Sequence, residues 1–233
     1  MNTCSNKVRI ILVSFAIALM GCVCARPNIK TSSQDEGRKN FIRDLESRTV
    51  ALVTDDGSGK LKPYCSGVWI DGEKFLTAAH CVNNKLLSFY MTKEDLEAGN
   101  TLSDGTLKLA SLIKISERDD LALFLVPNKI SKEPIQISKD DPWVGMRLHI
   151  IGHTSGMWWS YIEGLISAST KSTINENRVG SIQVSAPVWM GNSGGGAFDE
   201  QGRLVGLCSW MIVSAPNISF FIPASVIENF LKN

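Results

Sequence analysis

The sequence predicts an all-β protein with two six-stranded halves and a C-terminal helix. Short runs rich in strand-forming residues recur along the chain, and turn signals such as Ser103-Asp104-Gly105 separate them. The stretch 127–142, with a proline at each end, divides these runs into two sets. Ser225 and Glu228 form the pattern of a capping box, which begins a final helix ending at Lys232. Repeated short strands of this kind indicate a β-sandwich or a β-barrel.

Each half contains six expected strands. Those of the first half cover residues 49–54, 66–70, 75–78, 86–91, 106–115 and 121–126. Those of the second half cover residues 147–151, 159–169, 181–186, 195–198, 204–213 and 218–222. We expect one domain over 46–233, with lobes at about 46–135 and 136–222. Because pockets commonly form where two such units meet, the cleft between the lobes is the expected functional site.

The composition argues against a nucleic-acid or membrane-surface protein. The chain has 233 residues, enough for a substantial core, and its 24 Lys and Arg against 23 Asp and Glu give a net charge of +1. A charge so close to zero provides no basic surface for nucleic acid or for an anionic membrane. Neither is therefore an expected partner.

Residues 1–25 have the pattern of an export signal. Lys7 and Arg9 precede an apolar run at 10–20, which is too short for a comfortable membrane span. Leu19-Met20-Gly21-Cys22 has the form of a bacterial lipoprotein box, in which Cys22 carries the lipid, whereas 23–25 fits an ordinary signal-peptidase site. We favour the lipoprotein. The expected protein is exported, whether periplasmic, anchored in the cell envelope or secreted, and meets a membrane only through that lipid.

Residues 26–45 are expected to form a flexible tether. The part at 28–40 is polar, with almost no apolar residues, and cannot repay the entropic cost of ordering. A short helix is expected at 41–45, directly before the first strand.

Ser193 is the candidate nucleophile. It lies between glycines in Gly191-Asn192-Ser193-Gly194-Gly195-Gly196, where a chain of strand formers must bend sharply. Glycine permits backbone angles that other residues avoid and leaves space beside the hydroxyl. A flexible glycine turn would have the same sequence, so the interpretation depends on a base and an acid elsewhere in the chain.

A base and an acid both lie upstream of Ser193. His80 ends an apolar run, and Asp119 and Asp120 begin another. A serine hydroxyl needs an imidazole to take its proton, and a buried carboxylate to fix the tautomer of that imidazole. The order histidine, aspartate, serine is one of the orders in which such triads occur. The other histidines, His149 and His153, have expected structural roles, and their spacing matches no metal site, so neither a metal nor a cofactor is expected.

Three motifs together resemble the trypsin/chymotrypsin-fold serine proteases: T-A-A-H-C at 77–81, D-L-A-L at 120–123 and G-N-S-G-G at 191–195. The asparagine before the serine, with Gln183 and Ala186 upstream, is most similar to the bacterial Deg/Htr and glutamyl-endopeptidase types. The resemblance implies two antiparallel six-stranded β-barrels. Deg/Htr proteins carry a PDZ domain after the protease. No such domain is expected here, because Asn233 ends the chain after the last helix.

The resemblance also implies roles for particular residues. The acid is Asp120, with Asp119 on the opposite face of the strand, and the oxyanion hole is formed by the N–H groups of Gly191 and Ser193. Cys65 and Cys81 match a disulfide-bonded pair of the family, whereas Cys208 is expected to be a buried free thiol. Asn192 stands where digestive proteases have an aspartate that pairs with a newly cut N-terminus. We therefore expect no activation by cleavage near Arg48.

The predicted function is a serine endopeptidase that works through an acyl-enzyme on protein or peptide substrates, as a monomer. The expected substrate-binding residues are Pro187, Met190, Ser209, Trp210 and Met211. Pro187 replaces the acid that would select Lys or Arg, and Met211 replaces a glycine that opens the pocket. We therefore expect cleavage after small or aliphatic residues. The alternatives are a catalytically silent binding protein of the same fold and an envelope lipoprotein with a structural role.

Overall fold

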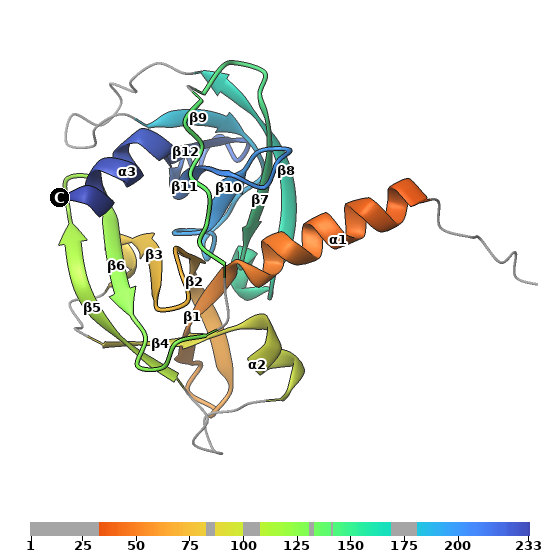
Figure 1. Ribbon diagram of the computed structural model, residues 1–233. Coiled ribbons are helices and arrows are strands. Elements are labelled where there is room, and N and C mark those ends of the chain that lie inside the picture. Colours follow the sequence, from red (N-terminus) through yellow and green to blue (C-terminus); the bar gives the residue numbers. More distant parts are fainter. Residues whose placement is uncertain (1–32, 83–86, 100–107, 131–132, 141, 169–180) are drawn as a thin grey trace, which may run out of the picture.

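The strands form two closed antiparallel barrels of six strands each (Figure 1). The computed structural model describes residues 33–82, 87–99, 108–130, 133–140, 142–168 and 181–233, so the predicted signal and Cys22 lie outside the described residues. The first barrel has the strand order β1-β2-β3-β6-β5-β4 and the second the order β10-β11-β12-β9-β8-β7. This arrangement confirms the predicted fold class.

Each predicted strand has an observed counterpart, with ends that differ by a few residues. The first barrel contains β1 (Thr49–Asp55), β2 (Leu61–Trp69), β3 (Lys74–Ala78), β4 (Leu87–Met91), β5 (Lys108–Ser116) and β6 (Leu121–Leu125). The second contains β7 (Arg147–Gly152), β8 (Ser160–Ala168), β9 (Ile182–Ser185), β10 (Gly196–Phe198), β11 (Leu204–Met211) and β12 (Ile218–Pro223). The fit is close because period-two patterning and turn residues mark the ends of short strands.

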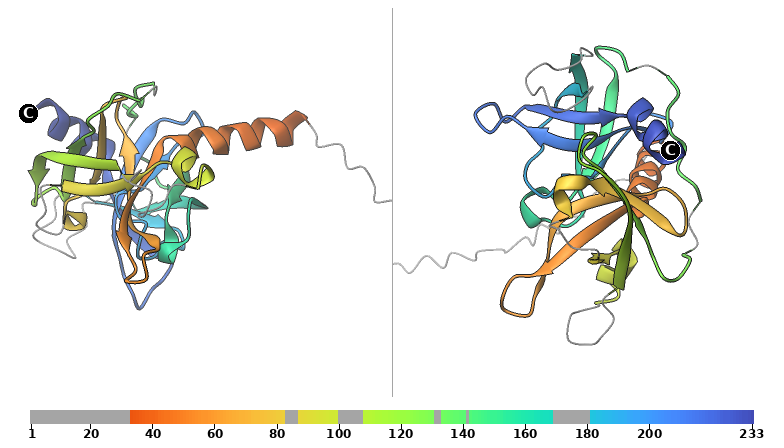
Figure 2. Two further views of the ribbon diagram at one scale, coloured as in Figure 1. Left: turned by 90° about the horizontal axis from the view of Figure 1, so that it is seen from below. Right: turned by 90° about the vertical axis from the view of Figure 1, so that its left-hand side faces the viewer.

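Apolar side chains fill each barrel, and a third cluster joins the two. The joining cluster takes Val68 and Leu76 from the first barrel and Phe198 and Leu207 from the second, all at 0% exposure. The chain between the barrels runs back across the second one, where Ile137 forms a parallel bridge with Leu204. The two views in Figure 2 show the barrels packed side by side. The shared core fixes the position of one lobe against the other.

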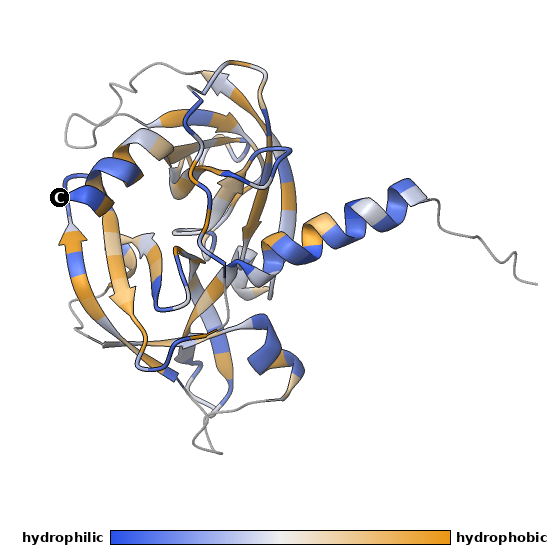
Figure 3. Cartoon of the chain, viewed as in Figure 1, coloured by the Kyte–Doolittle hydropathy of each residue, from blue (hydrophilic) through white to orange (hydrophobic). Residues whose placement is uncertain are grey.

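Helix α1 (Ser33–Ser47) corrects the prediction of a tether up to residue 45. Its C-terminal part is anchored, because Leu45 is fully buried in the joining cluster and Phe41 packs edge-on against His149. Its first eight residues are exposed and extend away from the barrels, and this part is mostly hydrophilic in Figure 3. The sequence predicted only the part of this helix at 41–45, because the burial that stabilises the helix involves only a few apolar residues near one end.

The described part of the chain contains two further α-helices, both shorter than α1. Helix α2 (Lys93–Glu97), which the sequence did not predict, has a capping box made by Thr92 and Asp95. The predicted C-terminal helix is present as α3 (Ala224–Lys232), but its N-cap is Pro223 with no side-chain hydrogen bond, so the predicted capping box is wrong. Lys114 of the first barrel reaches the Phe230 carbonyl of α3 and lies 4.5 Å from the centre of the Phe230 ring. The last helix therefore contacts both lobes.

Candidate active site

His80 and Asp120 are brought together by two neighbouring strands of the first barrel. His80 lies in the short 3-10 helix η1 (Ala79–Cys81) at the end of β3, and Asp120 directly precedes β6, which pairs with β3. The Nδ1 atom of His80 is 2.9 Å from Asp120 Oδ1 and 3.0 Å from Oδ2. The backbone N–H of His80 also donates to Oδ1, at 3.1 Å. The carboxylate therefore fixes both the ring and the backbone of the histidine.

Asp120 is buried, and groups from both lobes stabilise its charge. Its side chain has 6% exposure, against 38% for that of His80. Burial by itself raises the pKa of Asp120, but hydrogen bonds from the His80 ring, the Ser209 hydroxyl and the His80 N–H, with the charge of His80, leave the pKa below its usual value. The carboxylate is therefore ionised at neutral pH. Asp119 instead accepts a hydrogen bond from Ser116 at 2.8 Å.

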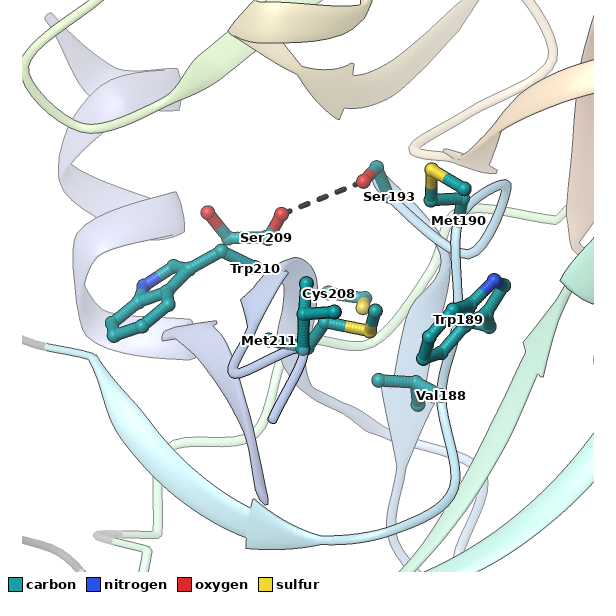
Figure 4. A pocket seen from close by; sticks show the side chains of 9 residues that line it. Val188, Trp189, Met190, Ser193, Cys208, Ser209, Trp210 and Met211 are labelled. Carbon is teal, nitrogen blue, oxygen red and sulfur yellow. Dashed lines mark hydrogen bonds between the residues drawn. The ribbon is translucent and has the colours of Figure 1, made fainter. Parts of the chain in front are cut away.

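Ser193 lies in the glycine-rich turn between β9 and β10, beside the end of β11. Its Oγ is 3.4 Å from the carbonyl oxygen of Ser209, the residue whose hydroxyl contacts Asp120 (Figure 4). Among the described residues its hydroxyl makes no hydrogen bond to His80. Catalytic hydrogen bonds in such sites often tighten only when substrate binds. The structure thus places the serine next to the residue that contacts the aspartate.

Hydrogen bonds to four successive carbonyl groups hold the backbone of the serine turn. The Met190 carbonyl accepts from Ser155 N and the Gly191 carbonyl from Ser66 Oγ, each at 2.7 Å. The Asn192 carbonyl accepts from Gly195 N and the Ser193 carbonyl from Ser66 N, each at 2.8 Å. Among the described residues no acceptor contacts the N–H groups of Gly191 and Ser193. Two backbone donors without an acceptor in the described part of the protein, next to a serine hydroxyl, are the kind of groups that an oxyanion hole requires.

Glycine is required at two positions of this turn. Gly191 has φ of +98°, and a Cβ there would lie 2.1 Å from the His153 carbonyl oxygen. Gly194 has φ of +82°, and a Cβ there would lie 2.2 Å from the Ser66 carbonyl oxygen. Both the backbone angles and the close approach exclude a side chain. These contacts pack the turn against both barrels.

An apolar pocket of about 210 Å³ opens beside Ser193 (Figure 4). Of the predicted substrate-binding residues, Met190, Ser209, Trp210 and Met211 line this pocket. The structure also adds Val188, Trp189, Cys208 and Val213 to the lining. Pro187 is exposed and is absent from the lining, whereas the next residue, Val188, is 2% exposed and lines the pocket. The described lining has no charged side chain.

Cys208 is the buried free thiol that the sequence predicts. Burial, with a smaller contribution from the charge of Asp120, raises the pKa of this thiol to about 12. The sulfur therefore lines the pocket as an apolar group and not as a thiolate.

The disulfide joins the two segments that hold the site. Cys65 on β2 and Cys81 in η1 are bonded, as the family resemblance implies. Cys81 follows His80 directly. Ser66 follows Cys65, and its backbone N–H donates a hydrogen bond to the Ser193 carbonyl. The bond therefore connects the neighbourhoods of the histidine and the serine.

Sequence reasoning missed the residues that support the turn. Ser66 contacts the Gly191 carbonyl, and Ser155, at φ of +53°, contacts the Met190 carbonyl. Asn192 is fully buried, and its side-chain Nδ2 donates to Thr154 Oγ1 at 2.9 Å. No spacing pattern marks Ser66 or Ser155, since their partners lie in distant parts of the chain, and nothing in the sequence indicates that Thr154 is the partner of Asn192.

Comparison with known proteins identifies the class. The model of the family described as "Trypsin-like peptidase domain" matches residues 65–207, more than half of the chain. The chain belongs to this trypsin-like peptidase family, whose members found here are serine-type peptidases.

Particular relatives are bacterial. The chain is 32% identical over 174 residues to the probable periplasmic serine endoprotease DegP-like of Buchnera aphidicola subsp. Schizaphis graminum, covering 72% of this chain and 34% of that protein. It is 30% identical over 173 residues to the periplasmic serine endoprotease DegP of Escherichia coli K12, covering 70% and 34%. The chain thus spans about a third of the length of these relatives.

Solved structures share the fold. The active form of the Rv3671c protease from M. tuberculosis has a TM-score of 0.69 at 16% identity, covering 84% of each chain. The serine endoprotease from Yersinia pestis has a TM-score of 0.66 at 22% identity, covering 83% of this chain and 65% of that one. Across the described part of the chain, no helix is long and apolar enough to span a membrane.

Proposed function

We propose that this chain is a serine endopeptidase in which Ser193 is the nucleophile, His80 the general base and Asp120 the orienting acid. The observation that carries the proposal is the 2.9 Å contact between His80 Nδ1 and the buried Asp120, held beside a serine turn with two available backbone donors. A lone serine in a glycine turn would need none of these features. Their presence in one place supports acyl transfer.

In the proposed reaction, His80 Nε2 takes the Ser193 hydroxyl proton as Oγ attacks the substrate carbonyl carbon. The carbonyl oxygen becomes an oxyanion, which accepts hydrogen bonds from the N–H groups of Gly191 and Ser193. His80 then gives the proton to the leaving amine as the peptide C–N bond breaks, leaving an ester on Ser193. A water molecule, deprotonated by His80, hydrolyses that ester and restores the serine. Asp120 stays ionised and stabilises the imidazolium.

We propose that the apolar pocket beside Ser193 receives the side chain that precedes the cleaved bond. Its volume of about 210 Å³ and its lining by Val188, Met190 and Met211 suit Ala, Val or Leu. A charged side chain would lose its hydration there without a partner among the described lining residues. The expected substrates are therefore proteins or peptides cut after small or aliphatic residues.

We also propose that the enzyme needs no activating cleavage near Arg48. Asn192 is already buried and hydrogen-bonded to Thr154, so no new N-terminal amine is required to order the turn. Export is part of the proposal, in keeping with the periplasmic location in the names of the DegP relatives. The lipid on Cys22 and the monomeric state remain predictions from the sequence.

Peptide hydrolysis tests the proposal. Purified protein, without protease treatment, should cleave a peptide anilide with Val before the scissile bond faster than matched peptides with Arg or Glu. Ser193→Ala should abolish turnover, with unchanged thermal unfolding as the control for folding. Equal turnover by the variant would refute Ser193 as nucleophile, and no turnover of any peptide by the wild type would favour the silent binding protein. Preference for Arg or Glu would refute the pocket assignment alone.

A further inference from the structure

Ser66 and His153 are buried side by side beneath the serine turn. Both have 0% exposure. Ser66 Oγ is 2.7 Å from the Gly191 carbonyl oxygen, 2.9 Å from His153 Nδ1 and 3.1 Å from the His153 backbone nitrogen. The proposed reaction uses neither side chain. The three contacts link the first barrel, the end of β7 and the turn that holds Gly191.

The hydrogen-bonding capacity of a serine hydroxyl decides which atom carries each proton. A hydroxyl has one proton to donate and two lone pairs. The Gly191 carbonyl can only accept, so the Ser66 hydroxyl donates its proton to it. The backbone N–H of His153 can only donate, so one lone pair of Ser66 Oγ accepts from it. The second lone pair then accepts from His153 Nδ1, which must carry a proton.

The surroundings of the ring agree with this tautomer. His153 Nε2 is buried and has no hydrogen-bond partner among the described residues, and Trp159 packs edge-on at 4.8 Å between ring centres. A bare lone pair is tolerated there better than a buried N–H without an acceptor. Burial also lowers the pKa of His153 to about 3, so the ring is neutral and holds a single proton.

We propose that Ser66 and His153 are positioning residues for the oxyanion hole, acting through a directed chain from His153 Nδ1–H to Ser66 Oγ and from the Ser66 hydroxyl to the Gly191 carbonyl. This inference rests on the proposed function. It adds to it by naming side chains that keep the turn in its working conformation without touching the substrate.

Gly191 needs such support because a glycine backbone is otherwise free to rotate. The Met190 carbonyl, held by Ser155 N at 2.7 Å, fixes the peptide before Gly191. The Ser66 hydroxyl fixes the peptide after it. In a trans peptide the N–H points opposite to the C=O, so anchoring the Met190 carbonyl on one side directs the Gly191 N–H to the other. The N–H of that second peptide, which belongs to Asn192, also donates to the Trp189 carbonyl at 3.1 Å. Without Ser66 and His153, the peptide after Gly191 keeps, among the described residues, only this longer hydrogen bond, and its carbonyl is no longer held.

Matched substitutions at His153 separate positioning from packing. His153→Leu fills the cavity but has no donor, whereas His153→Asn places an amide N–H the same number of bonds from Cα as Nδ1. Both variants lose the ring contact with Trp159. We expect kcat to fall roughly 10- to 100-fold in His153→Leu with KM little changed, less than the 100- to 1,000-fold typical of deleting an oxyanion donor. His153→Asn should recover most of that loss.

His149→Leu is the control, because His149 is also a buried histidine of the same lobe but contacts Tyr161, away from the turn. It should lower thermal stability without lowering kcat. Equal kcat in His153→Leu and wild type would overturn the proposal. So would equal losses in His153→Leu and His153→Asn, since packing alone predicts that result. Ser66→Ala should reduce kcat to a similar extent as His153→Leu.

A second measurement does not depend on catalysis. Nitrogen-15 NMR of the imidazole rings at neutral pH should show His153 protonated at Nδ1 and bare at Nε2, in both the wild type and Ser193→Ala. A ring protonated at Nε2 would overturn the proposed chain even in an active enzyme. If the predicted tautomer is found but no peptide is hydrolysed, the proposed function fails and the hydrogen-bonded chain stands as structural only, which refutes its catalytic role.

Discussion

Asp120 of the first barrel accepts a hydrogen bond from the Ser209 hydroxyl of the second barrel. Ser209 therefore contacts two members of the proposed triad. Its hydroxyl orients Asp120, and its carbonyl oxygen accepts a hydrogen bond from the Ser193 hydroxyl. Because the contact crosses between the lobes, the relative position of the barrels bears directly on the site. Packing of the joining core is therefore part of what aligns histidine and serine.

Ser209→Ala should make the protein more sensitive to acid. The pKa of Asp120 is lowered on folding, so its ionised form contributes stability above the unfolded pKa of about 3.9, and that contribution is lost as pH falls through the folded pKa. Ser209→Ala removes one of the hydrogen bonds that lower the pKa of Asp120. The folded-state pKa therefore rises, and the ionised carboxylate contributes less to the free energy of unfolding. The acid midpoint of unfolding, followed by circular dichroism, should move to higher pH. An unchanged midpoint would show that the Ser209 hydroxyl does not stabilise the carboxylate.

Met211→Ala should broaden the preference of the pocket. Met211 lines the pocket, and shortening it creates room for larger side chains. The ratio of kcat/KM for a Phe peptide over a Val peptide should rise about 10-fold or more, since a few methylenes in an apolar pocket are worth that much. Met157→Ala, at a methionine that is 57% exposed and outside the pocket lining, is the matched control. A similar change in both variants would refute the pocket assignment.

Loss of the Cys65 and Cys81 disulfide should destabilise the fold. The two residues are separated by 16 positions, and closing a loop of this length contributes about 3 kcal/mol in the chain-entropy description. The double variant Cys65→Ala, Cys81→Ala should unfold at correspondingly lower urea concentration. A reductant should lower the midpoint of the wild type and leave that of the double variant unchanged. Equal midpoints for the two oxidised proteins would contradict the prediction.

Helix α1 should matter for stability at its buried end only. Leu45 is fully buried in the core that joins the lobes, so Leu45→Ala should cost about 2–5 kcal/mol in the free energy of unfolding. Arg38 is exposed and pairs with Glu163 at the surface, so Arg38→Gln should leave the free energy of unfolding almost unchanged. Urea unfolding of the two variants beside the wild type measures both values. Similar effects would mean that the helix is held by its surface charges and not by Leu45.

The sequence predicted the barrels well because local features mark their strands. Alternating apolar residues and turn residues define short strands without reference to distant contacts. The helix over 33–47 was predicted only at 41–45 for the opposite reason, since Leu45 gains its burial from residues of both lobes. Contacts between distant residues also decide which side chains line the pocket, so counting back from Ser193 could not show that Val188 lines it and Pro187 does not.

The catalytic candidates and their supports differ in how visible they are in the sequence. His80, Asp120 and Ser193 stand in motifs whose neighbours carry part of the signal. Ser66 has no such motif, because its partners His153 and Gly191 are 87 and 125 positions away. A hydroxyl that holds a distant carbonyl can be found only when the fold brings the two together.

The proposed mechanism requires that Ser193 is acylated with the help of His80. The most direct measurement is mass-spectrometric mapping of the protein after reaction with a fluorophosphonate. We expect one adduct per chain, on the peptide containing Ser193, and loss of that adduct in Ser193→Ala and in His80→Ala. An adduct on another residue, or none in a correctly folded wild type, would contradict this mechanism.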